Sequence, residues 1–370
     1  MAVPLLDLKA QHITIRDSVM NAMTKVIDDQ AFILGEPVER LEREVALLSH
    51  TTHAIGCANG TDALLLALRA LNVGRGDEVL TTPFTFFATA GAVHNVGARP
   101  VFADIDPDTF NISTAALAAS LKPATKAVIA VDLFGQMAPI EAIMDAAGDR
   151  PVIEDAAQSI GARRKIDEKW VMAGQAATIG TFSFFPSKNL GGYGDGGMMV
   201  TQSDELATRL RRLRVHGGLK TYYHEEVGYN SRLDALQAAV LSAKLVNLAS
   251  WSAARRKNAA YYDAAFADLE GVRTPTIDPA NESIYNQYTL RVAHRDGLQG
   301  HLKDKEIGSA VYYPLSLHLQ PCFEYLGYKR GAFPESEKAA QEVISIPVYP
   351  ELRQQQLDEV IEAVRGFYGR

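Results

Sequence analysis

Cysteines and long apolar runs are scarce in this sequence. Its two cysteines, Cys57 and Cys322, cannot form a disulfide framework or supply most of a zinc site, and their ordinary interpretation is as small buried hydrophobic residues. No apolar run approaches the roughly 20 residues needed to cross a bilayer. The start, MAVPLLDLKAQ, has neither the basic nor the apolar region of a secretory signal. We therefore expect a cytoplasmic protein without a membrane partner.

An excess of positive charge is also absent. The sequence has 37 Lys and Arg against 44 Asp and Glu, a net charge of −7, and this argues against a nucleic-acid binder because such proteins need a basic face. A few local hydrogen-bond donors can still hold a small phosphorylated ligand. The segment around Gly60, between a predicted strand and a predicted helix, has neither the Gly-Lys-Ser/Thr of a P-loop nor the GxGxxG of a dinucleotide site, and the nine histidines show no HExxH or paired metal-ligand spacing. We therefore expect no metal, and a Rossmann oxidoreductase is disfavoured.

The sequence does contain a regular alternation of patterns. Its 370 residues, 47% of them hydrophobic, suffice for one large domain and a smaller companion. Between about residues 50 and 200, apolar runs alternate with helical stretches, which predicts parallel strands with helices on both faces. The predicted strands are His53–Ala58, Glu78–Thr82, Pro100–Asp104, Ala127–Val131, Val152–Asp155, Ile179–Phe184 and Met198–Val200, and the helices among them are Asp62–Leu71, Ala88–Val96, Thr114–Leu121 and Ile140–Ala147.

The pattern changes in the last third of the chain. After a turn-rich segment, Glu270–Pro279, an alternating strand and shorter helices predict a small α+β unit. We therefore predict a large α/β domain over 15–250 and a small domain over 251–370, to which an N-terminal arm, 1–14, belongs. The elements predicted from residue 204 onward are helices Asp204–Arg214, Leu233–Ala249, Trp251–Phe266, His301–Ile307 and Leu352–Tyr368, and the strand Ile284–Val292.

Three segments contain candidate chemistry. Gly60 and Thr61 lie between a strand and a helix, where free N–H groups favour a phosphate; the alternative is a tight turn in which Thr61 or Asp62 caps the helix. Asp155 ends a strand at the edge where open α/β sheets bind ligands, and it either meets a ring nitrogen or a metal, or caps a helix. Lys188 precedes a glycine-dense loop. Most lysines are solvated, but a desolvated lysine has a lowered pKa and can form an imine.

These three segments converge on one cofactor. Each lies at the carboxyl end of a predicted parallel strand, so that all three can face one crevice. Pyridoxal phosphate needs N–H donors for its phosphate, an anion for its ring nitrogen and an amine for its aldehyde. We therefore predict pyridoxal phosphate, with pyridoxamine phosphate as its aminated form.

Four motifs resemble a known family. ANGTDAL from Ala58, EDAAQS from Glu154, SFFPSKNLGGYGDGG from Ser183 and GYNSRLDALQAA from Gly228 closely resemble the pyridoxal-phosphate nucleotide-sugar aminotransferases of the DegT/DnrJ/EryC1/StrS family. The likeness covers nearly the whole chain. It implies a PLP-dependent transferase of fold type I, like aspartate aminotransferase, with a mostly parallel seven-stranded sheet and a smaller α+β domain. It also implies a homodimer with shared active sites.

The resemblance implies roles for the cofactor residues. Lys188 forms the internal aldimine and then moves the proton between substrate and cofactor. Asp155 pairs with the ring nitrogen, Gln158 bonds the ring oxygen and Ala157 packs beneath the ring. Phe86 stacks on the other ring face, although an aromatic in such a segment is more often part of a core. The implied phosphate ligands are Gly60, Thr61, Ser183 and, across the dimer interface, Asn230.

The resemblance also suggests substrate contacts. Arg232 either contacts the sugar or anchors its loop. Residues 312–321 resemble the family's substrate loop, so that Tyr312, Tyr313 and His318 are candidates. Tyr312 stands where many relatives have histidine. The alternative for each of these side chains is packing within the small domain.

The implied reaction transfers an amino group from L-glutamate to a keto carbon of a nucleotide-linked hexose. Residues 284–289 and 317–321 look most like the branch that makes 3-amino sugars, so that C3 is favoured over C4. The expected substrate is a dTDP-3-keto-6-deoxyhexose or a UDP-3-keto uronic acid, and the product would enter surface polysaccharide such as lipopolysaccharide O-antigen, or an antibiotic. One alternative is a pyridoxamine-phosphate-dependent sugar dehydratase, which has histidine in place of the lysine. The other is a non-catalytic regulator of the same fold, against which the intact Lys188, Asp155 and Gln158 argue.

Overall fold

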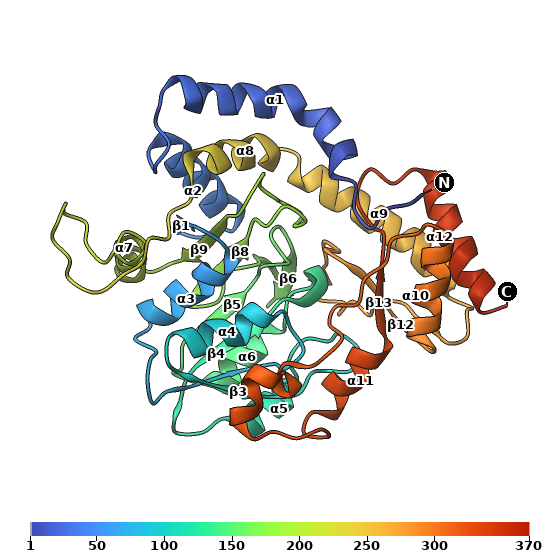
Figure 1. Cartoon of the computed structure of the whole chain (residues 1–370). Helices are drawn as coiled ribbons and strands as arrows, with labels where there is room; N and C mark the ends of the chain where they lie inside the picture. Colours follow the sequence, from blue (N-terminus) through green and yellow to red (C-terminus); the bar gives the residue numbers. More distant parts are fainter. Residues whose placement is uncertain (1, 370) are drawn as a thin grey trace.

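A seven-stranded sheet organises the computed structural model, which describes residues 2–369 (Figure 1). The strand order is β1-β9-β8-β5-β4-β2-β3. Within this sheet only β9 runs antiparallel to its neighbours, which confirms the predicted mostly parallel seven-stranded sheet. The strands are β1 (His53–Cys57), β2 (Glu78–Thr81), β3 (Arg99–Phe102), β4 (Thr125–Val131), β5 (Val152–Asp155), β8 (Ile179–Ser183) and β9 (Gly197–Thr201).

Alternate side chains of each strand enter two separate cores. In β4, Val128 and Ala130 face one core, whereas Ile129 and Val131 face the other. Because helices cover both faces, the strands are apolar throughout, and this is why they are visible in the sequence as continuous apolar runs. One face carries α2 (Glu36–Leu48), α5 (Thr114–Ser120), α6 (Ile140–Ala147) and α8 (Ala235–Leu245), and the other carries α3 (Gly60–Ala70), α4 (Phe87–Asn95) and α7 (Asp204–Leu213).

A smaller antiparallel sheet organises the C-terminal part, with the order β10-β12-β13. Its core includes Tyr262 and Val360, and also Val3, whose backbone pairs with Ile307. A third sheet has the order β11-β6-β7, in which the hairpin of β6 and β7 pairs with β11 beside α6. The remaining elements are α1 (Leu8–Asp28), β6 (Arg163–Ile166), β7 (Lys169–Met172), α9 (Leu248–Phe266), β10 (Val272–Arg273), β11 (Asn281–Glu282), β12 (Tyr288–Val292), α10 (Arg295–Asp304), α11 (Pro334–Glu342), β13 (Val343–Ile346), α12 (Gln354–Phe367) and the 3₁₀ turns η1 (Leu133–Gly135), η2 (Leu317–Leu319) and η3 (Pro321–Leu326).

The helix α9 crosses the predicted domain boundary. Leu248 and Trp251, near its start, pack against the large unit, while Tyr262 and Phe266 enter the core of the small sheet. The helix α1 lies along α8 (Figure 1). The division into 15–250 and 251–370 stays a prediction.

Three predicted elements differ from the structure. The helix predicted over 233–249 is two helices, because α8 ends at Leu245 before α9 begins. The strand predicted from Ile284 begins only at Tyr288, because the Ile284 N–H donates to Gly135 O (3.0 Å) outside the small sheet. The helix predicted over 301–307 is the end of α10, which starts at Arg295. Within the part of the chain that is described, no helix combines the length and the apolar character needed to span a membrane.

Candidate active site

Lys188 and Asp155 lie together at the carboxyl ends of two neighbouring strands. Asp155 is the last residue of β5, and Lys188 follows the adjacent strand β8. Burial lowers the pKa of the Lys188 amine to about 8, although the Asp155 carboxylate opposes this shift. Burial raises the pKa of Asp155, opposed by Lys188 and by a hydrogen bond of 2.8 Å from Thr89 Oγ1. The site therefore combines a partly neutral amine with a buried carboxylate.

A cradle for an anion lies at the start of α3. Asn59 caps this helix, since its side-chain oxygen accepts the Asp62 N–H at 2.8 Å, so the alternative in which Thr61 or Asp62 is the cap is wrong. The cap leaves the N–H groups of Gly60 and Thr61 without intrahelical acceptors. A Cβ on Gly60 would lie 2.7 Å from Ser183 Cβ, so glycine permits the close approach of helix and strand. These two amides and the Ser183 hydroxyl suit a phosphate.

An aromatic and amide wall stands beside the carboxylate. Gln158 is buried; its Oε1 accepts the Phe134 N–H (2.7 Å) and its Nε2 donates to the Tyr313 hydroxyl (3.1 Å). The Tyr313 ring lies 6.1 Å from the Phe86 ring. Phe86 is 57% exposed, so its interpretation as a core residue is wrong. The partly exposed Ala157 donates its N–H to Asp155 Oδ1 at 3.4 Å.

The four remaining predicted residues, Asn230, Arg232, Tyr312 and His318, differ in how far they are exposed. Asn230 is exposed, and Arg232 lines a groove together with Arg211 of α7 and Lys220 of the segment after α7. Tyr312 is partly buried beside Tyr313, with 5.8 Å between their ring centroids.

His318 lies inside the fold. Its side chain is fully buried, its Nε2 hydrogen-bonds to Glu337 Oε1 at 3.0 Å, and its ring packs edge-on against Phe333. This is the packing alternative, and the burial of His318 does not support a contact with substrate.

Sequence reasoning missed three residues of the site. Thr89 donates to Asp155 and lies one turn after Phe86 in a largely apolar helix. A polar residue at such a position is the sequence signal that could have identified it as part of the site. Asn59 precedes α3 and carries an ordinary cap signal. Lys244 on α8 is almost fully buried and donates to Gly191 O (2.5 Å), in the loop that follows Lys188. Nothing local distinguishes Lys244 from a surface lysine.

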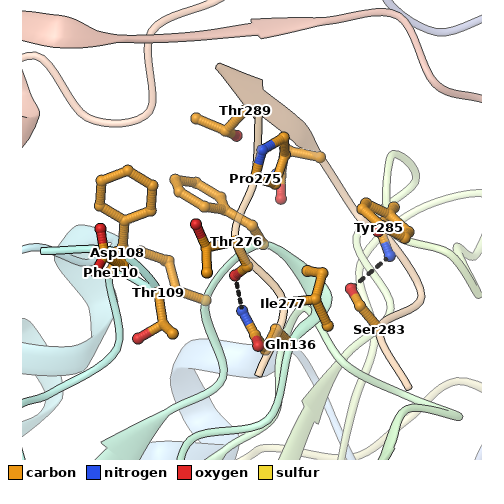
Figure 2. A pocket seen from close by; sticks show the side chains of 13 residues that line it. Asp108, Thr109, Phe110, Gln136, Pro275, Thr276, Ile277, Ser283, Tyr285 and Thr289 are labelled. Carbon is orange, nitrogen blue, oxygen red and sulfur yellow. Dashed lines mark hydrogen bonds between the residues drawn. The ribbon is translucent and has the colours of Figure 1, made fainter. Parts of the chain in front are cut away.

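A small cavity is lined without any contribution from Lys188. Its volume is about 20 Å³, room for about one water molecule. Its lining comes from Asp108–Phe110, from the turn around Gln136 and from the segment 275–289, and the Gln136 side chain donates to Thr276 O across it (Figure 2). None of the predicted site residues lines this cavity, which belongs to the junction between the two sheets.

The chain is similar to known proteins over nearly its whole length. Residues 14–365 match the model of the DegT/DnrJ/EryC1/StrS aminotransferase family. A protein of Acidithiobacillus ferrooxidans, described as UDP-N-acetyl-3-dehydro-alpha-D-glucosamine 3-aminotransferase, is 43% identical and covers 98% of this chain and 97% of its own. A "pleiotropic regulatory protein" of Geobacillus stearothermophilus is 50% identical over 100% of this chain and 99% of its own. The crystal structure of S. venezuelae DesV with a ketimine intermediate has a TM-score of 0.97 at 38% identity, covering 100% of this chain and 99% of its own.

Proposed function

Because the chain belongs to the DegT/DnrJ/EryC1/StrS aminotransferase family, we propose that it transfers an amino group from L-glutamate to the C3 keto carbon of a nucleotide-linked hexose. The observation that carries the proposal is the desolvated Lys188 amine beside the buried Asp155 carboxylate. The name of the Acidithiobacillus relative supports C3. The proposal includes pyridoxal phosphate as cofactor, a cytoplasmic location, and a homodimer in which Asn230 reaches the phosphate bound by the partner.

The residues present fit pyridoxal phosphate. The amides of Gly60 and Thr61 and the hydroxyl of Ser183 would hold its phosphate, since a Cβ at Gly60 would fill this cradle. When bound, the cofactor supplies an electron sink that stabilises negative charge on the reacting carbon. Asp155 holds a proton on the ring nitrogen, and Thr89 keeps the carboxylate aligned.

The other side chains orient the ring and move the proton. Gln158 is fixed by the Phe134 N–H, and its side-chain amide would donate to the ring oxygen. Phe86 and Ala157 would cover the two ring faces. With a pKa of about 8, the Lys188 amine accepts a proton from the substrate carbon and returns it at neutral pH. Arg232, Tyr312 and Tyr313 are the proposed contacts of the sugar nucleotide.

A regulatory role has one observation in its favour, the description of the Geobacillus relative. A regulator that only binds has no need of an amine with a lowered pKa beside a buried carboxylate. The geometry therefore favours catalysis.

A product screen tests the proposal. The purified protein, loaded with pyridoxal phosphate, is incubated with L-glutamate and with UDP- or dTDP-linked 3-keto and 4-keto hexoses, and products are identified by mass spectrometry. We expect 2-oxoglutarate and an amine from 3-keto substrates, and neither from Lys188→Arg. An amine from 4-keto sugars alone would overturn the choice of C3. A deoxygenated sugar would favour the dehydratase, and a cofactor absorbance unchanged by glutamate would favour the regulator.

A further inference from the structure

Two acidic side chains are enclosed behind the cofactor site. Glu154 on β5 and Asp132, directly after β4, are both 0% exposed. In the β4–β5 register, Ala130 pairs with Glu154 and Val131 pairs with Asp155. Glu154 therefore points to the opposite face of the sheet from Asp155, toward the same side as Asp132.

The surroundings of the two acids offer no compensating positive charge. Asp132 Oδ1 accepts the Ala138 N–H (2.8 Å), and Oδ2 accepts the Ser159 hydroxyl (2.7 Å). Within residues 2–369, neither carboxyl oxygen of Glu154 has a well-formed hydrogen bond, and only the nearby Gly174 N–H lowers the pKa of this acid. Two adjacent carboxylates in an apolar core are costly, and one retained proton removes this cost by turning one acid into a donor for the other.

The pKa shifts agree with a retained proton. Burial and the neighbouring Asp132 raise the pKa of Glu154 well above its ordinary value, and burial raises that of Asp132 to about 6. Asp155 raises the pKa of Asp132 further. Of the other charged groups on α6 and β4, Glu141 is held by Arg164, and Asp145 and Lys126 are exposed.

The acid pair is connected to the cofactor wall. The Asp132 N–H donates to Asp155 O at 3.1 Å. Two residues after Asp132, the Phe134 N–H donates to Gln158 and fixes it. The carboxylate of Asp132 accepts the N–H of Ala138, at the far end of the 132–138 turn, and the hydroxyl of Ser159, which follows Gln158 in the chain. A change in Asp132 would therefore displace the amide of Gln158.

We propose that Glu154 and Asp132 share one proton and act as positioning residues for Gln158. The Glu154 O–H donates to the Asp132 carboxylate, which then keeps both of its own hydrogen bonds and holds the 132–138 turn in place. The proton stays within the pair throughout turnover. This inference rests on the proposed function, because Gln158 is the proposed contact of the cofactor ring.

The protonated acid is tested first on the cofactor-free protein. Glu154→Gln keeps a donor that cannot ionise, and Glu337→Gln is the control, a buried glutamate remote from the pair. We expect an infrared carbonyl band of a protonated carboxyl at neutral pH in the parent and in Glu337→Gln, and its loss in Glu154→Gln. A protein with a buried carboxyl whose pKa is raised in the folded state loses folding stability as the pH rises above about 4.3. The free energy of unfolding of Glu154→Gln should therefore increase relative to that of the parent as the pH rises. A band that survives in Glu154→Gln would overturn the shared proton.

The positioning role is tested on the loaded protein. Glu154→Ala should lower kcat at least about tenfold and shift the pH midpoint of the cofactor's visible band, whereas Glu154→Gln should restore both. If Glu154→Ala does not fold, Asp132→Asn replaces it. The single amide oxygen of the asparagine cannot keep both hydrogen bonds that the Asp132 carboxylate accepts, and the variant has no carboxylate to accept the proton of Glu154. A loss of stability with kcat and midpoint unchanged would overturn the role. The infrared band needs neither cofactor nor substrate, so that it distinguishes failure of this inference from failure of the proposed function.

Discussion

At the residue scale, the site depends on burial that disfavours charge. The Lys188 amine is desolvated, and its pKa falls from an ordinary 10.5 to about 8. The unfolded chain therefore binds this proton more tightly than the folded one. As a result, folding stability is lost as the pH falls from about 10.5 to about 8, and the loss is complete at neutral pH.

Lys188→Met should therefore stabilise the cofactor-free protein. At pH 7 we expect the free energy of unfolding in urea to rise by at most about 3 kcal/mol, because the cost of the buried ammonium disappears. Near pH 10.5 the variant and the parent should become equally stable, apart from packing. Equal stability at pH 7 would contradict the desolvation of Lys188.

Thr89 tunes Asp155, so Thr89→Val should raise the pKa of this carboxyl further. Asp155 would then lose its negative charge at a higher pH, and the acid limb of the kcat/KM profile should move upward by roughly one pH unit. Thr85→Val is the matched control, since Thr85 bonds Thr89 at 3.0 Å rather than Asp155. An identical shift in both variants would assign the effect to packing.

At the element scale, the start of α3 is held against β8 too closely for a side chain at Gly60. Gly60→Ala should cost about 1–3 kcal/mol of stability by overpacking against Ser183, and it should weaken pyridoxal phosphate binding. Gly366→Ala in α12, where a Cβ meets nothing within 4 Å, is the control and should be neutral or stabilising. Cofactor titration by visible absorbance and urea unfolding measure the two effects. Unchanged affinity in Gly60→Ala would place the phosphate elsewhere.

The glycine-rich loop is held by α8. Lys244 donates to Gly191 O, and Gln237 Oε1 accepts the Tyr193 N–H at 2.8 Å. Two hydrogen bonds with side chains of α8 therefore hold the loop that follows Lys188 against this helix. Its glycines allow this approach, since a Cβ on Gly191 would lie 2.3 Å from Pro186 O.

At the scale of the whole molecule, Asn230 is an exposed residue on the segment that follows α7. The segment after α7 extends away from the sheet (Figure 1), and it exposes Tyr222 and Val227. A proposed homodimer would bring Asn230 to the partner's cradle. Sedimentation should then give a particle of twice 40.3 kDa.

Mixing two defective variants tests these shared sites. Lys188→Ala lacks the amine, and Asn230→Asp should weaken phosphate binding by charge repulsion. A mixed dimer contains one intact site, so that equal mixing should restore about a quarter of parental activity at limiting cofactor. Activity no higher than the average of the two variants would show that each site comes from one chain.

Much of the site could be predicted because its signals are local. Asp155 ends a continuous apolar strand, Gly60 follows another strand, and Lys188 stands before a run of glycines. His318 shows the limit of such reasoning. Its motif suggests a substrate loop, yet only the packing of Phe333 and the acceptor Glu337 show that its ring is enclosed.

By itself, the sequence determined the parallel sheet, the order of its strands along the chain and the three segments that form the candidate site. Apolar periodicity, glycine and strand ends are properties of neighbouring residues. Only the tertiary structure decided that Thr89 meets Asp155 across 66 residues, that Phe86 faces solvent and that Glu154 meets a second acid inside the core. These facts depend on which distant side chains pack together, and burial of that kind sets both pKa and exposure.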